Sequence, residues 1–411
     1  MFARYLGPFV KPNRIHLVPG RGIPGARVLL LSMRRTMDLA ASCALYEFED
    51  VIGELTGADR VEPETLERIE AYRRMYKLAR RLSGSPSMAK HLAPRFAGLV
   101  LEKDYDLFLP VFNNAYELFA LNAIPGWRKR CRFAACYVSE IWLQHFPRYL
   151  IELLAQFDRV YLGSVSPVAE VARTSGRPCA YLPLATDALL FSPYPNPPPW
   201  TIDVCGIGRR SAVTHAALLA AARERGLFYY FDSVRTRGPE VVDSSRQITF
   251  SVLNHAEHRF LLANLLKRSR YYIANRARAN EPDMTRGAEE ISGRFFEGAT
   301  AGTVIVGAAP QTETFREHFG WPDAVIPTPF DSPRIGDLIA ELDADPDRLA
   351  RIRRDNAANG LLRHDWVHRL GRIFADLGLA PTPAMNARAA RLRALAAQIK
   401  GAAVNRPAAG R

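Results

Sequence analysis

Two glutamates eight residues apart, Glu289 and Glu297, frame the start of the segment EEISGRFFEGATAGTVIVG at residues 289–307. The apolar run TVIVG predicts a buried strand, and the residues before it predict a helix that contains Glu297 and follows Glu289. Carboxylates in these positions are suited to charge-assisted hydrogen bonds with the hydroxyls of a ribose or a sugar. The start of the helix would also offer free backbone N–H groups to a diphosphate. The alternative is that Glu289 and Glu290 only complement the helix N-terminus and that Glu297 is solvated.

A pair of arginines forms a second candidate site. Arg209 and Arg210 lie in GIGRRSAVTH at residues 206–215, directly after the predicted strand IDVCG. Planar guanidinium groups bind phosphate oxygens through two hydrogen bonds at once. These residues therefore suit a diphosphate, and the alternative is a solvated pair at the start of a helix.

Polar residues also follow predicted strands in the N-terminal half. Glu140 in YVSEIW comes just past the end of a strand, and it is a candidate base or hydroxyl anchor. Asn113 and Asn114 follow FLPVF at the end of another strand, and Asp187 precedes a proline-rich segment. For each of these four residues the alternative is a turn or cap residue.

Other chemistries find little support. The Asp-x-Asp sequences at 104–106 and 343–345 are predicted to be structural, and His255 and His258 are predicted to serve helix capping and surface roles. His364 and Asp365 are predicted to form a structural hydrogen-bonded pair. No metal site is therefore expected. The five scattered cysteines contain no CxxC pair, which favours a reducing cytoplasm.

The order of short apolar runs and helical patterns indicates how these residues are positioned. Runs such as RVLLLS, YDLFLPVF and RFAACYV alternate with helical stretches, and a second alternating series begins after SPYPNPPPW at 192–200. This order predicts two parallel sheets with crossover helices. A helical stretch is expected over about 60–92, and another helix over 382–400 with an apolar stripe that docks on the protein itself. The expected boundaries are a basic N-terminal extension at 1–25, an acceptor-side domain at 26–190, a proline-rich linker at 191–200, a second domain at 201–376, and a basic helix and tail at 377–411.

The net charge of +13 comes from the two ends of the chain. Residues 1–37 hold seven Lys and Arg without an acid, and residues 377–411 hold six, also without an acid. Such ends suit weak attraction to an anionic membrane surface or a polyanion, or they serve only as solvated tails. No stretch reaches the roughly 18 unbroken apolar residues of a membrane span.

The segment EEISGRFFEGATAGTVIVGAAPQTETF resembles the C-terminal domain of group 1 glycosyltransferases, a retaining family with the GT-B fold. Glu289 and Glu297 match the family's Glu-x(7)-Glu spacing, and RFFEGATAG resembles the form found in the spore-maturation-protein-like branch. LLRHDWVHRLGRIF is similar to that branch's closing helix, and YLPLATDALLFSPYP is similar to the interdomain segment. The resemblance covers about residues 181–376.

The resemblance implies roles for individual residues. Glu297 would bind the ribose of a nucleotide, and Glu289 would contact the donor sugar near the bond that breaks. The family usually has a lysine shortly after the first glycine-rich turn of this domain, and this chain lacks it. Other residues must therefore supply the positive charge that the lysine would place near the diphosphate. The diphosphate contacts are expected among Gly208, Arg209, Arg210, His215, Arg294 and Lys267.

We therefore expect an α/β protein of GT-B architecture, with two doubly wound Rossmann-like domains facing across a cleft. It would be a cytoplasmic, or membrane-peripheral, glycosyltransferase of the hexosyltransferase type. It would transfer a sugar with retention to a glycan, lipid-linked or small-molecule hydroxyl, without a metal, a protein nucleophile or any cofactor besides a UDP- or GDP-sugar substrate. The alternatives are a sugar-nucleotide epimerase on the same fold, or a non-enzymatic binder of polyanions or nucleic acid that uses the basic termini.

Overall fold

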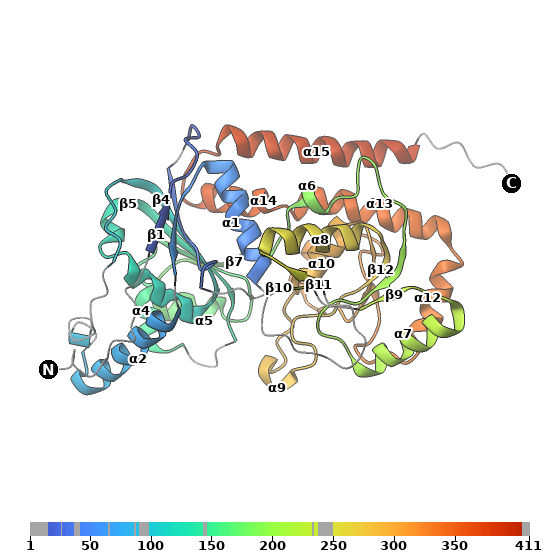
Figure 1. Ribbon diagram of the computed structural model, residues 1–411, viewed down its shortest axis with the longest axis horizontal. Coiled ribbons are helices and arrows are strands. Elements are labelled where there is room, and N and C mark those ends of the chain that lie inside the picture. The colour runs from blue at the N-terminus through green and yellow to red at the C-terminus, as the bar shows by residue number, and fades with distance from the viewer. Residues whose placement is uncertain are drawn as a thin grey trace. The chain divides into compact units, whose positions relative to one another are not determined.

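The computed structural model describes residues 15–25, 27–36, 42–64, 66–85, 88–89, 98–142, 146–231, 234–236 and 250–404. They form two compact units. The first unit takes in the described residues up to 36, then 52–163 and 167–182, and the second takes in 42–51, 164–166 and 183–404. Most of the expected N-terminal extension and the end of the C-terminal tail lie outside the described residues. Figure 1 shows the elements along the chain.

The first unit is built on a seven-stranded sheet. All of its neighbouring strands are parallel except β1 and β3, which pair antiparallel. The four apolar runs predicted as strands in this half, RVLLLS, YDLFLPVF, RFAACYV and DRVYLG, are confirmed as β2, β4, β5 and β6. In sheet order the strands are β1 (Ile15–Val18), β3 (Asp59–Pro63), β2 (Val28–Leu31), β4 (Tyr105–Asn114), β5 (Cys131–Glu140), β6 (Arg159–Leu162) and β7 (Cys179–Tyr181).

The helix expected over about 60–92 is wrong at its start, because β3 occupies Asp59–Pro63. Charged side chains conceal this strand in the sequence. Glu62 is only 2% exposed, and its carboxylate is paired with Arg35 at 2.6 Å. The helices of this unit are α1 (Cys43–Thr56), whose first residues belong to the second unit, α2 (Leu66–Ser83), the 3₁₀ helices η3 (Ala115–Ala123) and η4 (Trp127–Arg130), α4 (Arg148–Leu154) and α5 (Val168–Ser175).

The second unit contains a five-stranded sheet in which all strands are parallel. Each of its strands was predicted from an apolar run of the sequence, namely IDVCGIG, LFYYF, YYIAN, GTVIVG and AVIPT. A separate parallel pair is formed by β10 (Val234–Thr236) and β11 (Phe250–Val252). The order of the main sheet is β14 (Ile326–Pro327), β13 (Val304–Gly307), β12 (Ser269–Ile273), β8 (Ile202–Cys205) and β9 (Tyr229–Tyr230).

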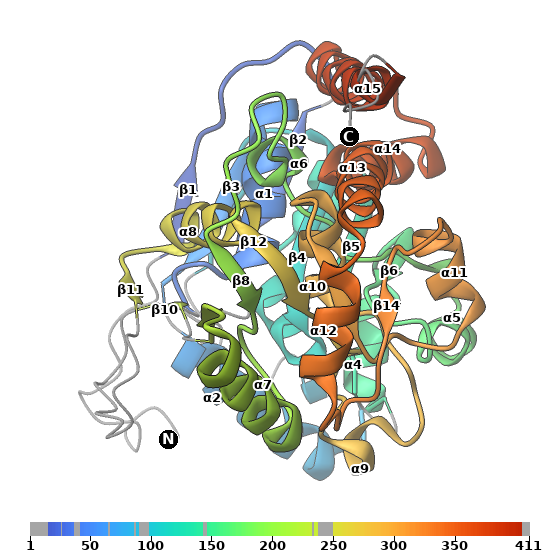
Figure 2. The ribbon, with the colours of Figure 1, turned by 90° about the vertical axis from the view of Figure 1, so that its right-hand side faces the viewer.

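Helices cover both faces of this second sheet, as a doubly wound fold requires (Figure 2). On one face α8 (His255–Lys267), α10 (Gly293–Thr300) and α11 (Glu313–Phe319) share a core with the strands. On the other face α7 (Ala212–Arg225), α12 (Ile335–Asp343) and the start of α13 (Pro346–Arg363) do the same. The remaining helices are α6 (Ala188–Phe191), α9 (Pro282–Thr285), α14 (Trp366–Asp376) and α15 (Pro383–Val404).

Helix α15 packs against α13 and α14 through the apolar stripe expected from its sequence. Met385, Leu392, Ala396 and Ile399 are all at most 2% exposed. Among the described helices none is both long and apolar enough to cross a membrane.

Arg388 of α15 was counted with the basic C-terminal end of the chain, which was expected either to attract an anionic partner or to be solvated. For Arg388 both expectations are wrong, because its side chain is buried. Its side chain is 4% exposed, and it donates two hydrogen bonds to Asp365, at 2.9 and 2.8 Å. A third bond, of 2.6 Å, reaches Asp187. Asp365 is itself fully buried and accepts the backbone N–H of Val367 at the start of α14. The charge of Arg388 therefore anchors α15.

His364 does not pair with Asp365 as predicted, because Asp365 is engaged by Arg388. The His364 ring is fully buried in an aromatic cluster, 4.8 Å from the ring of Phe319 and edge-on to Phe296 at 5.0 Å. Neither ring nitrogen has a hydrogen-bond partner among the residues that the structure describes. Burial lowers the pKa of His364 well below its usual value, and burial, followed by the charge of Arg369, lowers that of His318 to about 4.

We expect Arg388→Ala to lower the free energy of unfolding by about 3–5 kcal/mol, because it leaves the buried Asp365 carboxylate without its partner. Arg391→Ala, on the exposed face of the same helix, serves as the matched control and should change it by less than about 0.5 kcal/mol. Denaturant unfolding of both variants measures the difference. Equal, small effects would show that the anchor contributes nothing.

The buried histidines predict a loss of stability in acid. Their folded-state pKa values lie below the unfolded value of about 6.5, so the unfolded state binds more protons as the pH falls below 6.5. The free energy of unfolding should then fall by up to about 1.4 kcal/mol per pH unit for each histidine between pH 6.5 and 4. Denaturant unfolding across this range should show a weaker pH dependence for His364→Leu than for wild type. A control, His16→Gln, whose side chain is 37% exposed, should keep the wild-type slope.

Candidate functional site

The turn between β8 and α7 lies at the carboxyl edge of the second sheet, where ligands bind in open parallel sheets. Gly208 in this turn has a φ of 89°, and a Cβ added there would lie 2.5 Å from Nη2 of Arg294. Nη1 of Arg294 donates to the carbonyl of Arg209 at 3.4 Å. The structure therefore brings together Gly208, Arg209 and Arg294, which the sequence assigned to one phosphate site.

A pocket opens beside this turn, at the carboxyl ends of the strands. Arg209 has its Nε 3.2 Å from Oε1 of Glu281 and is half exposed. Arg210 donates to the carbonyl of Phe231 at 2.9 Å. The lining comes from the turn, from α7 and from the loops after β12 and β14, and includes Gly206, Arg209, Arg210, His215, Asn275 and Thr328.

His215 lies in this pocket, but it is not the missing positive charge. Its Nδ1 is 3.0 Å from the hydroxyl of Tyr229. Burial, and then the charge of Arg210, lowers the pKa of His215, which disfavours the charged form of the ring. Lys267 cannot supply the charge either, because it ends α8 just before β12 begins and therefore lies at the opposite, amino edge of the sheet. Arg294 is the one of the three expected residues that reaches the turn.

Helix α10 starts without a side-chain cap, so its first N–H groups are not occupied by its N-cap residue. The hydroxyl of Ser292, the N-cap residue, instead donates to the carbonyl of Asn275 at 2.7 Å. Gly298 lets the helix pack closely on the sheet, since a Cβ there would meet the ring of Tyr272 at 2.7 Å. Arg294 and Glu297, three residues apart, lie on one face of this helix.

Glu297 is only 8% exposed, which excludes the alternative that its side chain is solvated. Its Oε1 pairs with Nη1 of Arg259 on α8. No hydrogen bond from the described residues reaches Oε2. One carboxylate oxygen is therefore held by Arg259, and the other receives no hydrogen bond from the described part of the chain.

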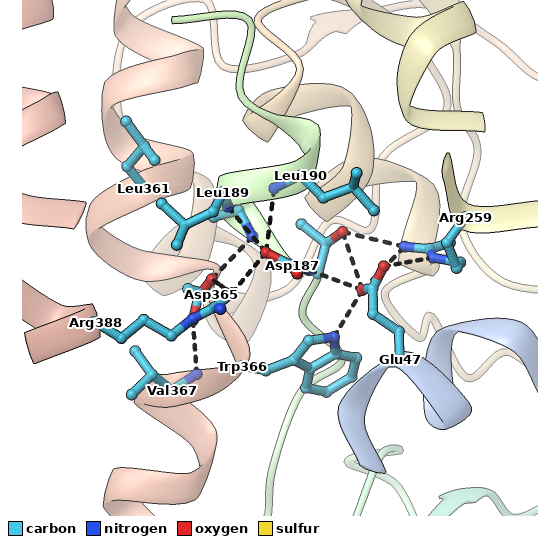
Figure 3. A network of polar contacts seen from close by, with 12 residues as sticks. Glu47, Asp187, Leu189, Leu190, Arg259, Leu361, Asp365, Trp366, Val367 and Arg388 are labelled. Atoms are coloured by element: carbon cyan, nitrogen blue, oxygen red, sulfur yellow. Dashed lines mark hydrogen bonds and ion pairs between the residues drawn. The ribbon is translucent and has the colours of Figure 1, made fainter. Parts of the chain in front are cut away.

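Arg259 continues this contact into a buried network drawn in Figure 3. It is 3% exposed, and its Nε donates to Oε2 of Glu47 at 2.8 Å. Glu47 also accepts the indole N–H of Trp366 at 2.8 Å. Burial raises the pKa of Glu47, although Arg259 opposes this shift. Sequence reasoning missed both residues, because a charged residue in a helix is usually exposed and no motif marks these two.

The two glutamates before α10 have different partners. Oε2 of Glu289 accepts the N–H of Gln311 at 2.6 Å, and its Oε1 lies 3.5 Å from Nη1 of Arg276. Glu290 is only 4% exposed and accepts the N–H groups of Val165 and Ser166 at 2.8 and 2.9 Å. Glu290 thus holds the backbone at Val165 and Ser166. The sequence had suggested only that Glu290 complements the helix N-terminus.

The candidates of the acceptor side divide into two groups. Asn114 and Asp187 act as caps, since Asn114 accepts from Tyr116 N at 3.0 Å and Asp187 accepts from Leu189 N at 3.0 Å. Glu140, the last residue of β5, is exposed and accepts the indole N–H of Trp142 at 3.2 Å. Asn113 is half-buried, and its backbone N–H donates to Glu117 at 2.8 Å.

The residues set aside in the sequence have structural partners. Asp343 accepts from the hydroxyl of Tyr271 at 2.7 Å, and Asp345 caps α13 as predicted. His255 lies 2.8 Å from Asp50, but its helix is capped by Asn254. His258 is 8% exposed rather than on the surface, and burial lowers its pKa to about 4. Within the described residues no group of acidic, histidine and cysteine side chains could hold a metal ion.

Comparison with known proteins finds a family match for part of the chain. Residues 216–375 match the family described as "Glycosyl transferase-like". No curated protein sequence matches the chain. A glycosyltransferase from Rickettsia africae has a similar structure, with a TM-score of 0.51 and 9% identity over 86% of this chain and 98% of that chain. The Anabaena protein Alr3699/HepE in complex with UDP-glucose gives a TM-score of 0.48 and 13% identity over 86% of this chain and 99% of that chain.

The Rickettsia structure supports the fold, and the matched family segment contains α10 with the Glu289 and Glu297 pair. The expected resemblance of this part of the chain to the group 1 glycosyltransferases is confirmed.

Proposed function

We propose that the protein is a glycosyltransferase that moves a sugar from a nucleotide-sugar donor to an acceptor hydroxyl. The observation that carries this proposal is one face of α10, which presents Arg294 towards the Gly208 turn and Glu297 one helical turn from the uncapped N-terminus. A cation beside free N–H groups suits a diphosphate, and a carboxylate at this spacing suits the hydroxyls of the attached ribose. The family match over residues 216–375 supports the same activity.

The charges of the site fit departure of a nucleoside diphosphate. As the bond to the sugar breaks, negative charge builds on the diphosphate, and Arg209, Arg294 and the start of α10 stabilise it. Glu297 holds the ribose, and Glu289 contacts the donor sugar. The donor is a UDP- or GDP-sugar, and transfer proceeds with retention and without a metal or a covalent intermediate on the protein.

The acceptor binds on the first unit. Glu140 is exposed at the carboxyl end of β5, where it accepts the proton of the acceptor hydroxyl, and Asn113 provides a further contact. Asn114 and Asp187 serve mainly as caps. The acceptor is a hydroxyl of a glycan, of a lipid-linked sugar or of a small molecule.

Nucleotide-sugar binding should raise the thermal midpoint. A ligand at 100 times its dissociation constant adds about 2.7 kcal/mol to the folded state, so one member of a panel of UDP-, GDP-, TDP- and ADP-sugars should stabilise the wild type. Glu297→Gln, which keeps the shape of the side chain, should lose most of this shift. A wild type that responds to no sugar nucleotide would contradict the proposal.

Arg294 should act on the diphosphate and not on the nucleoside. We expect Arg294→Ala to weaken binding of UDP or GDP by roughly ten- to hundredfold, as for loss of a charged hydrogen bond, while binding of uridine or guanosine stays unchanged. Calorimetric titration of both ligand classes measures this difference. Arg223→Ala, on the exposed side of α7, is the matched control and should leave both affinities unchanged. If Arg294→Ala weakened binding of the nucleoside and of the nucleoside diphosphate equally, Arg294 would not belong to the phosphate site.

A further inference from the structure

We infer that Arg259, held by Glu47, is a positioning residue that fixes the Glu297 carboxylate for the ribose of the donor. This inference rests on the proposed function, in which Glu297 receives the ribose hydroxyls. It adds two residues outside the Glu-x(7)-Glu motif, one of which lies far from it in the sequence. The residues concerned all belong to the second unit.

Each of the three guanidinium nitrogens of Arg259 donates a hydrogen bond. Its Nε donates to Glu47, its Nη1 to Glu297 and its Nη2 to the hydroxyl of Thr186 at 3.1 Å. The guanidinium also lies over the ring of Phe191, 4.6 Å from its centroid. Each nitrogen of the planar fork is therefore committed, and the group has a single orientation.

Glu47 is fixed from several directions, as Figure 3 shows. Besides Arg259, its Oε1 accepts the backbone N–H of Asp187 at 2.7 Å and the indole N–H of Trp366 at 2.8 Å. These donors come from the segment before α6 and from the start of α14. Glu47 thus links Arg259 to the segment before α6 and to the start of α14.

The arrangement determines what Glu297 presents to a ligand. Oε1 of Glu297 is held by Arg259, and Oε2 receives no hydrogen bond from the described residues. A carboxylate that is already oriented loses little freedom when a hydroxyl binds it, so more of the interaction appears as affinity.

A buried ion pair that only stabilised the fold would not distinguish between related ligands. Loss of such a pair would weaken all nucleotides alike, or would lower the thermal midpoint alone. A positioning role predicts instead that, without Arg259 or Glu47, the ribose hydroxyls contribute less to the affinity for a nucleotide. The ratio of affinities for a nucleotide and its deoxy counterpart measures this directly.

The test uses the full chain and compares UDP and GDP with their 2′-deoxy and 3′-deoxy counterparts by calorimetric titration. Wild type should bind the preferred ribonucleotide roughly ten- to hundredfold more tightly than the deoxy form whose missing hydroxyl bonds Glu297. Arg259→Lys and Glu47→Gln should reduce this ratio to within about threefold of that of Glu297→Gln. The matched control is Arg268→Lys, an exposed arginine at the end of α8, which should keep the wild-type ratio.

Thermal midpoints of all variants report whether each one folds. If Arg259→Lys or Glu47→Gln fails to fold, Trp366→Phe removes one donor of Glu47 and should still lower the ratio. Folded variants that keep the wild-type ratio while Glu297→Gln loses it would overturn the positioning role and leave the proposed function standing. A wild type that binds none of these nucleotides would overturn the proposed function, and the inference with it.

Discussion

Two buried guanidinium groups of the second unit, Arg259 and Arg388, are paired with carboxylates, and the surrounding elements are arranged around these pairs. Arg259 and Arg388 are 3% and 6% exposed. An unpaired charge at such depth costs several kcal/mol, so each group is matched by carboxylates. The segment 186–188 serves both networks, since it contacts Glu47 and Arg259 through Thr186 and the N–H of Asp187, and Arg388 through the Asp187 carboxylate.

Neutralisation of these charges also connects distant parts of the chain. Arg388 joins α15 to the start of α14 through Asp365, and Arg259 joins α1 and α8 to α10. The second connection reaches the candidate site, because Glu297 is both a partner of Arg259 and the carboxylate assigned to the ribose. A structural interaction and a binding group thus share one side chain.

The sequence predicted most of the fold because buried parallel strands are continuous apolar runs. β4 and β13 are of this kind, whereas β3 was missed because Arg60 and Glu62 alternate with its apolar residues. The candidate site was predicted in part, since Glu289, Glu297, Arg209 and Arg294 belong to recognisable motifs. Glu47, Arg259 and Glu290 could not be found in this way, because only tertiary packing buries these charges and pairs them.

The central claim is that the face of α10 with Arg294 and Glu297 binds a nucleoside diphosphate. A crystal structure of the full chain with UDP or GDP, whichever binds more tightly, tests it most directly. We expect the diphosphate to lie against the Gly208 turn and Arg294, with a ribose hydroxyl on Oε2 of Glu297 while Oε1 stays on Arg259. A nucleotide bound away from α10, or a ribose that leaves Glu297 without a contact, would contradict it.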